Sequence, residues 1–452
     1  MKVIILGAGH VGSSVARSLA NEGYDVVVID INPERLRELQ DRVDIATVAG
    51  FGTFPDTLER ANIQEADLLI AVMPRDEDNM TACQIAWALY HPPLIIARIR
   101  NIHYLAYPEI FTNNNIHVDE LISPESLVTD YVQRLIEYPG VRQLHDFNNG
   151  ALKLVSLNIQ TNSPAMNKPL REIHAAMPDI RCVAIFRDNK LLTADNDILI
   201  ASGDRLLYTI PSTQLLESIN LFQQGSKPYK RIIIAGGGHV GKRLAIALQE
   251  NFKVKIIEKD DKRARSIAEQ LEKTIVLSGD ATDPDLLKDE GISDSDVFCA
   301  LTSSDEANIL SSMMAKKLKV RETICLVNKT TYMDMILSST IDTVFSPERI
   351  TSANILRYVR KGGVVNVCPI HGSSLEVLEI IVEGNQETSR VVGLQCDQLT
   401  LPEGVSINVI IRGEQLLELR DNPVIETRDH LILVVPIKQI AAIQNYFQVT
   451  TV

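Results

Sequence analysis

Short apolar runs alternate with amphipathic segments through the first part of the chain. The runs read VIILG, DVVVID, ATVAG, DLLIAV and LIIARI, and helical patterns such as SSVARSLANEG and PERLRELQDRV lie between them. Strands that alternate with helices in this way build a parallel sheet with helices on both faces. The pattern predicts an α/β fold with a doubly wound, Rossmann-type parallel sheet.

The pattern changes after Pro139-Gly140. The chain then reads KLVSLNI, RCVAIFRDNKLL and DRLLYTIP, which are strand-like runs with turn residues such as Gly203-Asp204 between them. Such runs are typical of a small, strand-rich domain. We therefore expect a small α+β domain to follow the parallel sheet.

The chain also repeats itself. KVIILGAGHVGSSVARSLANEGYDVVVID at the start returns as RIIIAGGGHVGKRLAIALQENFKVKIIEKD, and at the same offset Gly50 matches Gly279 and Asp67 matches Asp296. Weaker matches continue into the small domain, so the duplicated unit spans a whole half. We predict a Rossmann domain over 1–138, a small domain over 139–222, a polar linker over 223–229, a second Rossmann domain over 230–360 and a second small domain over 361–452.

Each half carries a glycine motif between an apolar strand and a helix. In this position GxGxxG is the dinucleotide-binding fingerprint: the first glycine allows a tight turn, the second lets the backbone approach a pyrophosphate, and the third permits close helix packing. The helix N-terminus then faces the phosphates. The motif residues are Gly7, Ala8, Gly9, His10, Val11 and Gly12 in the first half, and Gly236, Gly237, Gly238, His239, Val240 and Gly241 in the second.

The second strand of each Rossmann domain ends in an acid, Asp30 or Glu258. A carboxylate at this place accepts hydrogen bonds from ribose hydroxyls and repels a 2′-phosphate, which favours NAD(H) over NADP(H). The alternative is that both are surface acids at strand ends. The histidines at positions 10 and 239 invite a catalytic interpretation, but side chains there usually point along the helix, and we expect no catalysis.

Further candidates follow the later strands. Met73-Pro74 and Thr302-Ser303 stand where the crevice of such a sheet opens. Arg98 is placed to reach nucleotide phosphates, with a salt bridge across the cleft as the alternative.

The two halves differ in a segment that we expect to lie near Asp30 and Glu258. Asp280 can hydrogen bond a ribose or an adenine, whereas the first half has Phe51-Gly52 in this region and can only stack or pack there.

The segment from Glu125 to Tyr138 has an apolar stripe at helical spacing. The simpler interpretation is that this helix packs within its own half. The alternative is that it crosses over to pair with a partner unit.

Composition narrows the function. A net charge of −13 disfavours nucleic acid, and the cysteines and histidines form no CxxC, HxxxH or HExxH spacing, so we expect no metal site from neighbouring ligands. No apolar run approaches the roughly 20 residues of a membrane span. The first residues lack the pattern of a signal peptide, so we expect a cytoplasmic protein.

These features resemble the regulator of K+ conductance family, and within it the peripheral NAD-binding subunits of Trk potassium uptake systems. The likeness covers essentially the whole chain. It rests on the doubled GAGHVG and GGGHVG motifs, the two acids, the DEDN and DEAN segments, the SPE stretches and the small domain after each Rossmann unit.

The resemblance implies a nucleotide site at Gly7, Gly9, His10, Val11, Asp30, Met73, Pro74 and Arg98, and another at residues 236–240 with Glu258. Phe51 and Gly52 depart from the acidic pattern of the family, so the resemblance does not establish how well the first site binds a ribose. The resemblance also implies rings of eight such units beneath a membrane potassium-transport subunit, so that four chains of this kind would form a homotetramer at the inner face of the membrane.

The expected function is that of a non-catalytic regulatory subunit, in which NAD+ or NADH shifts the ring between two geometries. The family resemblance also allows ATP or ADP, since the glycine loop recognises pyrophosphate. An NAD-dependent oxidoreductase is the alternative from another class, but neither half supplies a matching proton donor such as dehydrogenases need. An NAD sensor that acts on a protein other than a transporter stays open.

Overall fold

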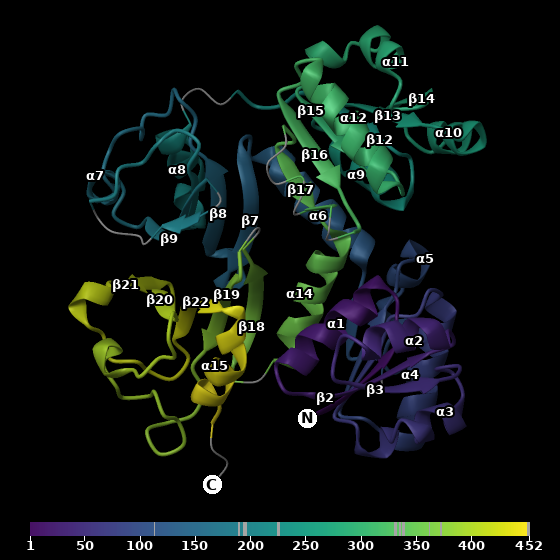
Figure 1. The fold of residues 1–452 in the computed structure, drawn as a ribbon, viewed down its shortest axis with the longest axis vertical. Helices are drawn as coiled ribbons and strands as arrows, with labels where there is room; N and C mark the ends of the chain where they lie inside the picture. The colour runs from purple at the N-terminus through teal and green to yellow at the C-terminus, as the bar shows by residue number, and fades with distance from the viewer. Residues whose placement is uncertain are drawn as a thin grey trace. The chain divides into compact units, whose positions relative to one another are not determined.

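The computed structural model describes residues 1–112, 114–188, 190–192, 197–223, 227–329, 332–333, 336, 340–360, 362–370 and 373–449 (Figure 1). It divides into two compact units: Met1–Leu127 with Pro347–Lys361, and Val128–Ser346 with Gly362–Val452. The middle of the predicted linker, 224–226, lies outside the described residues. The two compact units do not coincide with the two duplicated halves, and the five predicted segments stay a prediction.

The first unit contains a parallel sheet of order β3-β2-β1-β4-β5-β6. Apolar residues alternate between its two faces: Val3 and Ile5 belong to one buried cluster, Ile4 and Leu6 to the other. Both faces are covered, which explains the continuous apolar runs. The strands are β1 (Lys2–Leu6), β2 (Asp25–Asp30), β3 (Ala46–Ala49), β4 (Leu68–Ala71), β5 (Leu94–Arg98) and β6 (Glu120–Ile122), and the helices are α1 (His10–Asn21), α2 (Pro33–Gln40), α3 (Pro55–Arg60), α4 (Asp76–Tyr90) and α5 (Ile102–Leu105).

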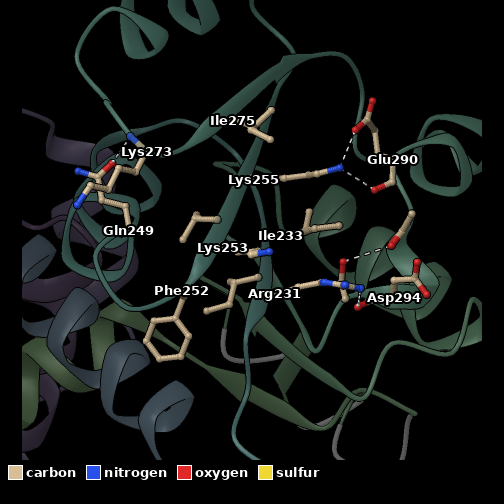
Figure 2. A pocket seen from close by; sticks show the side chains of 14 residues that line it. Arg231, Ile233, Gln249, Phe252, Lys253, Lys255, Lys273, Ile275, Glu290 and Asp294 are labelled. Atoms are coloured by element: carbon tan, nitrogen blue, oxygen red, sulfur yellow. Dashed lines mark hydrogen bonds and ion pairs between the residues drawn. The ribbon is translucent and has the colours of Figure 1, made fainter.

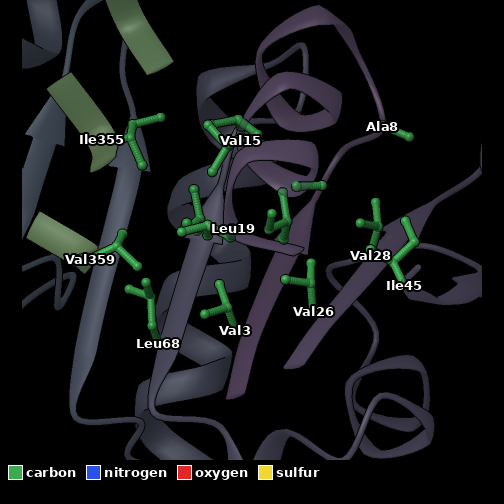
Figure 3. Close-up of a cluster of buried hydrophobic side chains, with 14 of the residues drawn as sticks. Val3, Ala8, Val15, Leu19, Val26, Val28, Ile45, Leu68, Ile355 and Val359 are labelled. Atoms are coloured by element: carbon green, nitrogen blue, oxygen red, sulfur yellow. The ribbon is translucent and has the colours of Figure 1, made fainter. Parts of the chain in front are cut away.

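A helix from the second half completes the first unit. Helix α14 (Pro347–Val359) packs on α1, and its Ile355 and Val359 join the buried cluster that contains Val15 and Leu19 (Figure 3). Directly after it, Arg360 forms a buried ion pair with Glu22 at 2.7 Å. The second half of the chain thus supplies part of the hydrophobic core around the first Rossmann sheet.

The second unit contains a sheet of order β14-β13-β12-β15-β16-β17, which repeats the strand order of the first. This equivalence confirms the predicted fold class and the duplication. The strands are β12 (Arg231–Ala235), β13 (Lys253–Glu258), β14 (Ile275–Ser278), β15 (Val297–Ala300), β16 (Glu322–Leu326) and β17 (Thr343–Phe345), and the helices are α9 (His239–Leu248), α10 (Asp261–Ala268), α11 (Pro284–Asp289) and α12 (Asp305–Lys317).

Two five-stranded antiparallel sheets, β10-β9-β11-β8-β7 and β18-β19-β22-β20-β21, form the small domains in the same unit. They share one buried cluster, to which Phe147 and Phe186 contribute from the first sheet and Val409 and Ile432 from the second. The strands are β7 (Val141–Phe147), β8 (Leu152–Asn158), β9 (Arg181–Arg187), β10 (Lys190–Leu192), β11 (Arg205–Pro211), β18 (Val364–Pro369), β19 (Leu375–Ile381), β20 (Ser406–Arg412), β21 (Gln415–Leu417) and β22 (His430–Pro436), and the helices are α7 (Leu170–Ala176), α8 (Leu215–Phe222) and α15 (Ile440–Phe447).

Helix α6 (Pro124–Glu137) carries the apolar stripe, and from Val128 onward it belongs to the second unit. The ring of its Tyr131 lies 5.7 Å from that of Phe345, at the end of the second Rossmann sheet. The helix also contacts its own half, where Tyr131 donates its hydroxyl to the carbonyl of Arg142. Packing within its own half and a crossover to the other half are therefore both found in the structure. An apolar stripe demands a buried face, but it does not say which domain buries it.

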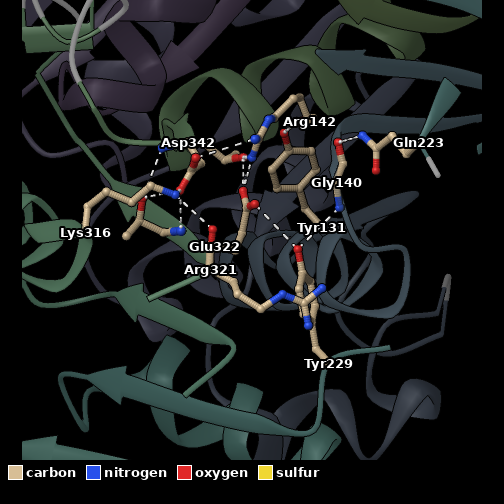
Figure 4. Close-up of polar contacts among 11 residues, drawn as sticks. Tyr131, Gly140, Arg142, Gln223, Tyr229, Lys316, Arg321, Glu322 and Asp342 are labelled. Carbon is tan, nitrogen blue, oxygen red and sulfur yellow. Dashed lines mark hydrogen bonds and ion pairs between the residues drawn. The ribbon is translucent and has the colours of Figure 1, made fainter. Parts of the chain in front are cut away.

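A polar cluster accompanies this contact (Figure 4). Arg142 of β7 pairs with Glu322 at the start of β16 and lies 3.6 Å from Asp342. Tyr229, from the end of the predicted linker, donates its hydroxyl to Glu322 and stands under Arg321. These contacts join the first small domain to the second Rossmann sheet inside one unit.

Among the described residues, we find no helix whose length and apolar character would let it span a membrane.

Candidate functional site

The glycine motif of each Rossmann domain forms the turn between the first strand and the first helix. Gly7 has φ +106°, a value that L side chains rarely adopt, and a Cβ there would lie 3.1 Å from the carbonyl of Val72. A Cβ on Gly12 would lie 1.9 Å from the carbonyl of Gly7, so only glycine allows the helix to approach. Gly236, with φ +103°, and Gly241 meet the same restrictions in the second domain.

The middle glycines behave differently. A Cβ on Gly9 or Gly238 would meet no described atom within 4 Å. Both residues are the N-caps of their helices, and neither has a side-chain cap. The free N–H groups of these first turns suit an anion. Glycine at this place is therefore not required by the protein's own packing, as expected where a ligand approaches the backbone.

The predicted acids hold these loops. Asp30 accepts the N–H of Ala8 at 2.6 Å and the N–H of Asn32 at 2.8 Å, one on each carboxylate oxygen. Glu258 accepts the N–H of Gly237 at 2.8 Å and that of Asp260 at 2.9 Å in the same manner. Each carboxylate retains unused lone pairs, because an ionised carboxylate has about four acceptor sites. The acids can thus shape the loop and still accept a ribose hydroxyl.

In each Rossmann domain an asparagine that was not predicted as a site residue links the ends of the fourth and fifth strands by hydrogen bonds. Asn79 accepts the N–H of Met73 at 2.8 Å, and it donates to the carbonyls of Met73 and Arg98 at 3.1 and 2.8 Å. Asn308 repeats this pattern with Thr302 and Leu326. The sequence could have indicated these two residues, because Asn79 and Asn308 occupy matching positions in the DEDN and DEAN segments of the two halves.

In the first domain Arg98 ends β5, and Met73-Pro74 follow shortly after β4; Met73 and Arg98 are both bonded to this asparagine. Arg98 donates to the carbonyl of Met73 at 2.5 Å, and its Nε is buried without a partner. Burial lowers the pKa of this guanidinium. No described carboxylate forms an ion pair with it, so the predicted alternative of a salt bridge is not what the structure shows. Arg98 retains a donor for an anion.

In the second domain the side chains of Thr302 and Ser303 have different surroundings. Thr302 donates its hydroxyl to Asn308 at 2.6 Å, so this side chain supports the strand end, while Ser303 is exposed. Asp280 accepts Lys259 at 2.7 Å and both the N–H and the hydroxyl of Thr282. These bonds, that of Lys259 first, lower the pKa of Asp280 to about 2. Lys259 at this edge was missed by sequence reasoning.

The loop histidines lie at the surface. His10 is largely exposed, with its Nδ1 3.9 Å from Oε2 of Glu348 on α14, and His239 is exposed as well. Burial raises the pKa of Glu348. Within the described residues, no group of histidines, cysteines and acids is arranged to hold a metal ion, and all six cysteines are free thiols.

Together, the duplicated parallel sheets and glycine loops define a tandem Rossmann protein of the dinucleotide-binding architecture. A family model, the TrkA-N domain, matches residues 3–124 and 232–347. The chain is 40% identical over 452 residues to the Trk system potassium uptake protein TrkA of Vibrio alginolyticus, with 99% of each chain covered. It therefore belongs to the TrkA family of Trk system potassium uptake proteins.

Two solved structures are similar in fold. The GsuK RCK domain superimposes with a TM-score of 0.62 at 16% identity, covering 99% of this chain and 94% of that one. The GsuK channel bound to NAD gives the same TM-score and identity and is covered to 78%. These two structures confirm the predicted fold, and the predicted resemblance to Trk potassium uptake proteins is confirmed by the TrkA-N match and by the TrkA relative.

Proposed function

We propose that the chain is the cytoplasmic, non-catalytic, nucleotide-binding subunit of a Trk-type potassium uptake system. It binds NAD+ or NADH at two glycine loops and acts on a membrane potassium-transport subunit at the inner face of the membrane. The observation that carries the proposal is the pair of loops, each held in place by an acid with spare acceptor capacity. The NAD bound to the related GsuK channel supports the choice of ligand, and ATP or ADP is the alternative for a pyrophosphate-recognising loop.

Contacts around the first loop suggest how a ligand signal travels. Helix α1 begins at the loop, and α14, which comes from the other half of the chain, packs along it. Glu348 in the first turn of α14 approaches His10 in the loop itself. A ligand seated here would contact groups from both halves. If its affinity differs between two arrangements of α14, binding shifts their populations, and about 1–3 kcal/mol per site would suffice.

Three buried ionisable groups outside the glycine loops do not suit catalysis. Burial raises the thiol pKa of Cys83 and Cys299, and it lowers the pKa of His145 to about 4. Such groups are inert parts of a core rather than nucleophiles or proton donors. Four chains, each with two Rossmann domains, would form the proposed eight-unit ring, in which several weak sites act on one gate.

Calorimetric titration of the full chain with NADH, NAD+ and ATP tests the ligand. Gly9→Ala and Gly238→Ala are the sharpest variants, because the added methyl fits the free protein but obstructs a pyrophosphate. We expect each variant to lose one site and the double variant to lose both, with unchanged circular dichroism. Wild-type nucleotide affinity and stoichiometry in the double variant would show that the nucleotide does not bind at the glycine loops.

Capture of a co-expressed Trk-type transporter from membranes tests the partner. We expect retention of the transporter to change with nucleotide for the wild-type chain and to become insensitive to nucleotide in the Gly9→Ala/Gly238→Ala variant. A transporter that never copurifies in either condition would contradict the regulatory role, whatever the titrations show.

A further inference from the structure

A pocket of about 550 Å³ lies in the second Rossmann domain, where β12, β13 and β14 begin. The glycine loop is at the opposite edge of this sheet, since it follows the end of β12. Gln249 and Phe252 line one side of the pocket, and Glu290 and Asp294 the other (Figure 2). The nucleotide site therefore does not account for it.

Four cationic side chains line the pocket: Arg231, Lys253, Lys255 and Lys273. Lys255 is engaged, because its Nζ lies 2.9 Å from both the carbonyl and a carboxylate oxygen of Glu290. Arg231 donates at 3.3 Å to the backbone carbonyl of Asp294, which leaves its charge largely uncompensated. Four cations face two lining carboxylates, so the pocket carries an excess of positive charge in a strongly acidic chain.

Neither Lys253 nor Lys273 is held by a buried ion pair. Lys273 pairs with Glu250, but both side chains are more than half exposed, and such pairs contribute little. Lys253 is exposed and has no ion-pair partner among the described residues. An anion entering the pocket would meet Lys253, Lys273 and Arg231 without having to break a buried ion pair.

The first Rossmann domain has the opposite charge at this edge. The strand registers pair Lys2 with Asp25 there and Arg231 with Lys253 here, so Asp25 occupies the place of Lys253. In the same way Asp44, two residues before Ala46, corresponds to Lys273, two residues before Ile275. Since the folds are equal, the structure of the sheet does not require these lysines.

The pocket wall also has an apolar part. The ring of Phe252 and the side chain of Ile275, which is 54% exposed, line it beside the lysines. The volume lies within the range of small-molecule sites, about 300–1,000 Å³. Lysine and arginine together suit phosphate oxygens, and an apolar wall suits a carbon skeleton. We propose that this pocket is a further ligand site of the chain, distinct from the two glycine loops, for a small soluble organic phosphate carrying at least two negative charges.

Titration of the full chain with fructose 1,6-bisphosphate tests the proposal, using the Gly9→Ala/Gly238→Ala background to block the glycine loops. We expect saturable binding in that background, at least about tenfold weaker in Lys253→Asp/Lys273→Asp, which introduces the residues of the first domain. Lys253→Gln/Lys273→Gln should show an intermediate loss. Lys317→Asp/Lys438→Asp makes the same charge change at exposed positions outside the pocket and should bind normally.

Several outcomes would overturn the proposal. If the bisphosphate binds the wild-type chain but not the Gly9→Ala/Gly238→Ala background, it binds at the nucleotide sites. If its affinity is unchanged in Lys253→Asp/Lys273→Asp, it binds outside this pocket. Equal binding of citrate would remove the preference for phosphate. Lysine-dependent cosedimentation with phosphatidylglycerol vesicles, without binding of the soluble bisphosphate, would assign the pocket to lipid headgroups. Since the glycine background is used, failure here leaves the proposed nucleotide function untouched.

Discussion

The two Rossmann domains hold their glycine loops by the same contacts but differ where an adenosine would lie. In the first domain, Ile31, Phe51 and Phe54 are 65, 55 and 51% exposed, and the two phenylalanine rings are 5.0 Å apart. In the second, the corresponding edge carries the ion pair of Lys259 and Asp280. Duplication has kept the hydrogen bonds that shape the glycine loop and changed the residues beside it. We infer that the two sites differ in nucleotide selectivity rather than in the class of ligand.

The largest expected effect comes from the acids that the two domains share. Asp30→Asn and Glu258→Gln remove a charge-assisted acceptor from the loop, a loss of about 1.5–3 kcal/mol. We expect NADH affinity at the altered site to fall by about ten- to a hundredfold. The loss should be greater for Glu258, which is only 5% exposed. Calorimetry on each site, with the other blocked by Gly9→Ala or Gly238→Ala, measures the difference.

Asp67→Asn is the control for this pair of variants. Its carboxylate accepts the N–H of Lys2 at the opposite edge of the first sheet, so the chemical change is equal but far from the loop. Affinity that falls as much in Asp67→Asn would mean that any weakened strand end affects binding. Equal affinity in all three variants would show that the acids serve the fold alone.

The second largest expected effect is a difference between the two sites in their selectivity for NADH over NADPH. Lys259 offers a cation beside Glu258, whereas the first site presents Ile31 and Phe51 to a 2′-phosphate. We expect NADPH to bind the second site better than the first by about tenfold, an effect of one exposed charge-assisted contact. Lys259→Ile should abolish this advantage and leave NADH affinity nearly unchanged. NADPH binding that is equal at both sites would contradict the comparison.

The glycine motifs, the acids and the duplicated parallel sheet could be predicted from the sequence, because each depends on neighbouring residues and on a pattern that occurs twice. The bonds of Asn79 and Asn308 could not, since they depend on which carbonyls two separate strand ends present. The domain against which α6 packs could not be predicted either, because an apolar stripe shows that a helix face is buried but not which domain buries it. The basic pocket combines Arg231, Lys253 and Lys273, whose proximity follows from sheet register rather than from spacing.

An effect on stability, rather than on binding, distinguishes the two small domains. His145 in β7 matches Cys368 in β18, and burial, with some help from Arg134, lowers the pKa of His145 to about 4. Its unfolded value is about 6.5. The unfolded chain therefore binds the extra proton between these values, and stability decreases as the pH falls from about 6.5 to about 4.

We expect His145→Cys, the residue of the second domain, to flatten this slope by about 1–3 kcal/mol over the interval. Denaturant unfolding at several pH values measures the slope, which is independent of any constant loss from the smaller side chain. His103→Cys alters an exposed histidine and should keep the wild-type slope. An unchanged slope in His145→Cys would mean that this histidine titrates normally in the folded chain.

The smallest effect concerns the ion pair that marks the second site. Asp280 is held ionised by Lys259 and Thr282, and its pKa is lowered to about 2. Because a lowered acid pKa stabilises the fold above the unfolded value, this contribution is present at pH 7 and is lost as the pH falls from about 4 towards 2. The pair is exposed, so Asp280→Asn should cost less than about 1 kcal/mol at pH 7. Denaturant unfolding should show this small change, while titration shows weaker NADH binding at the second site only. A stability loss of several kcal/mol would instead make Asp280 a structural residue, and the difference between the two adenosine edges would then reflect folding rather than ligand choice.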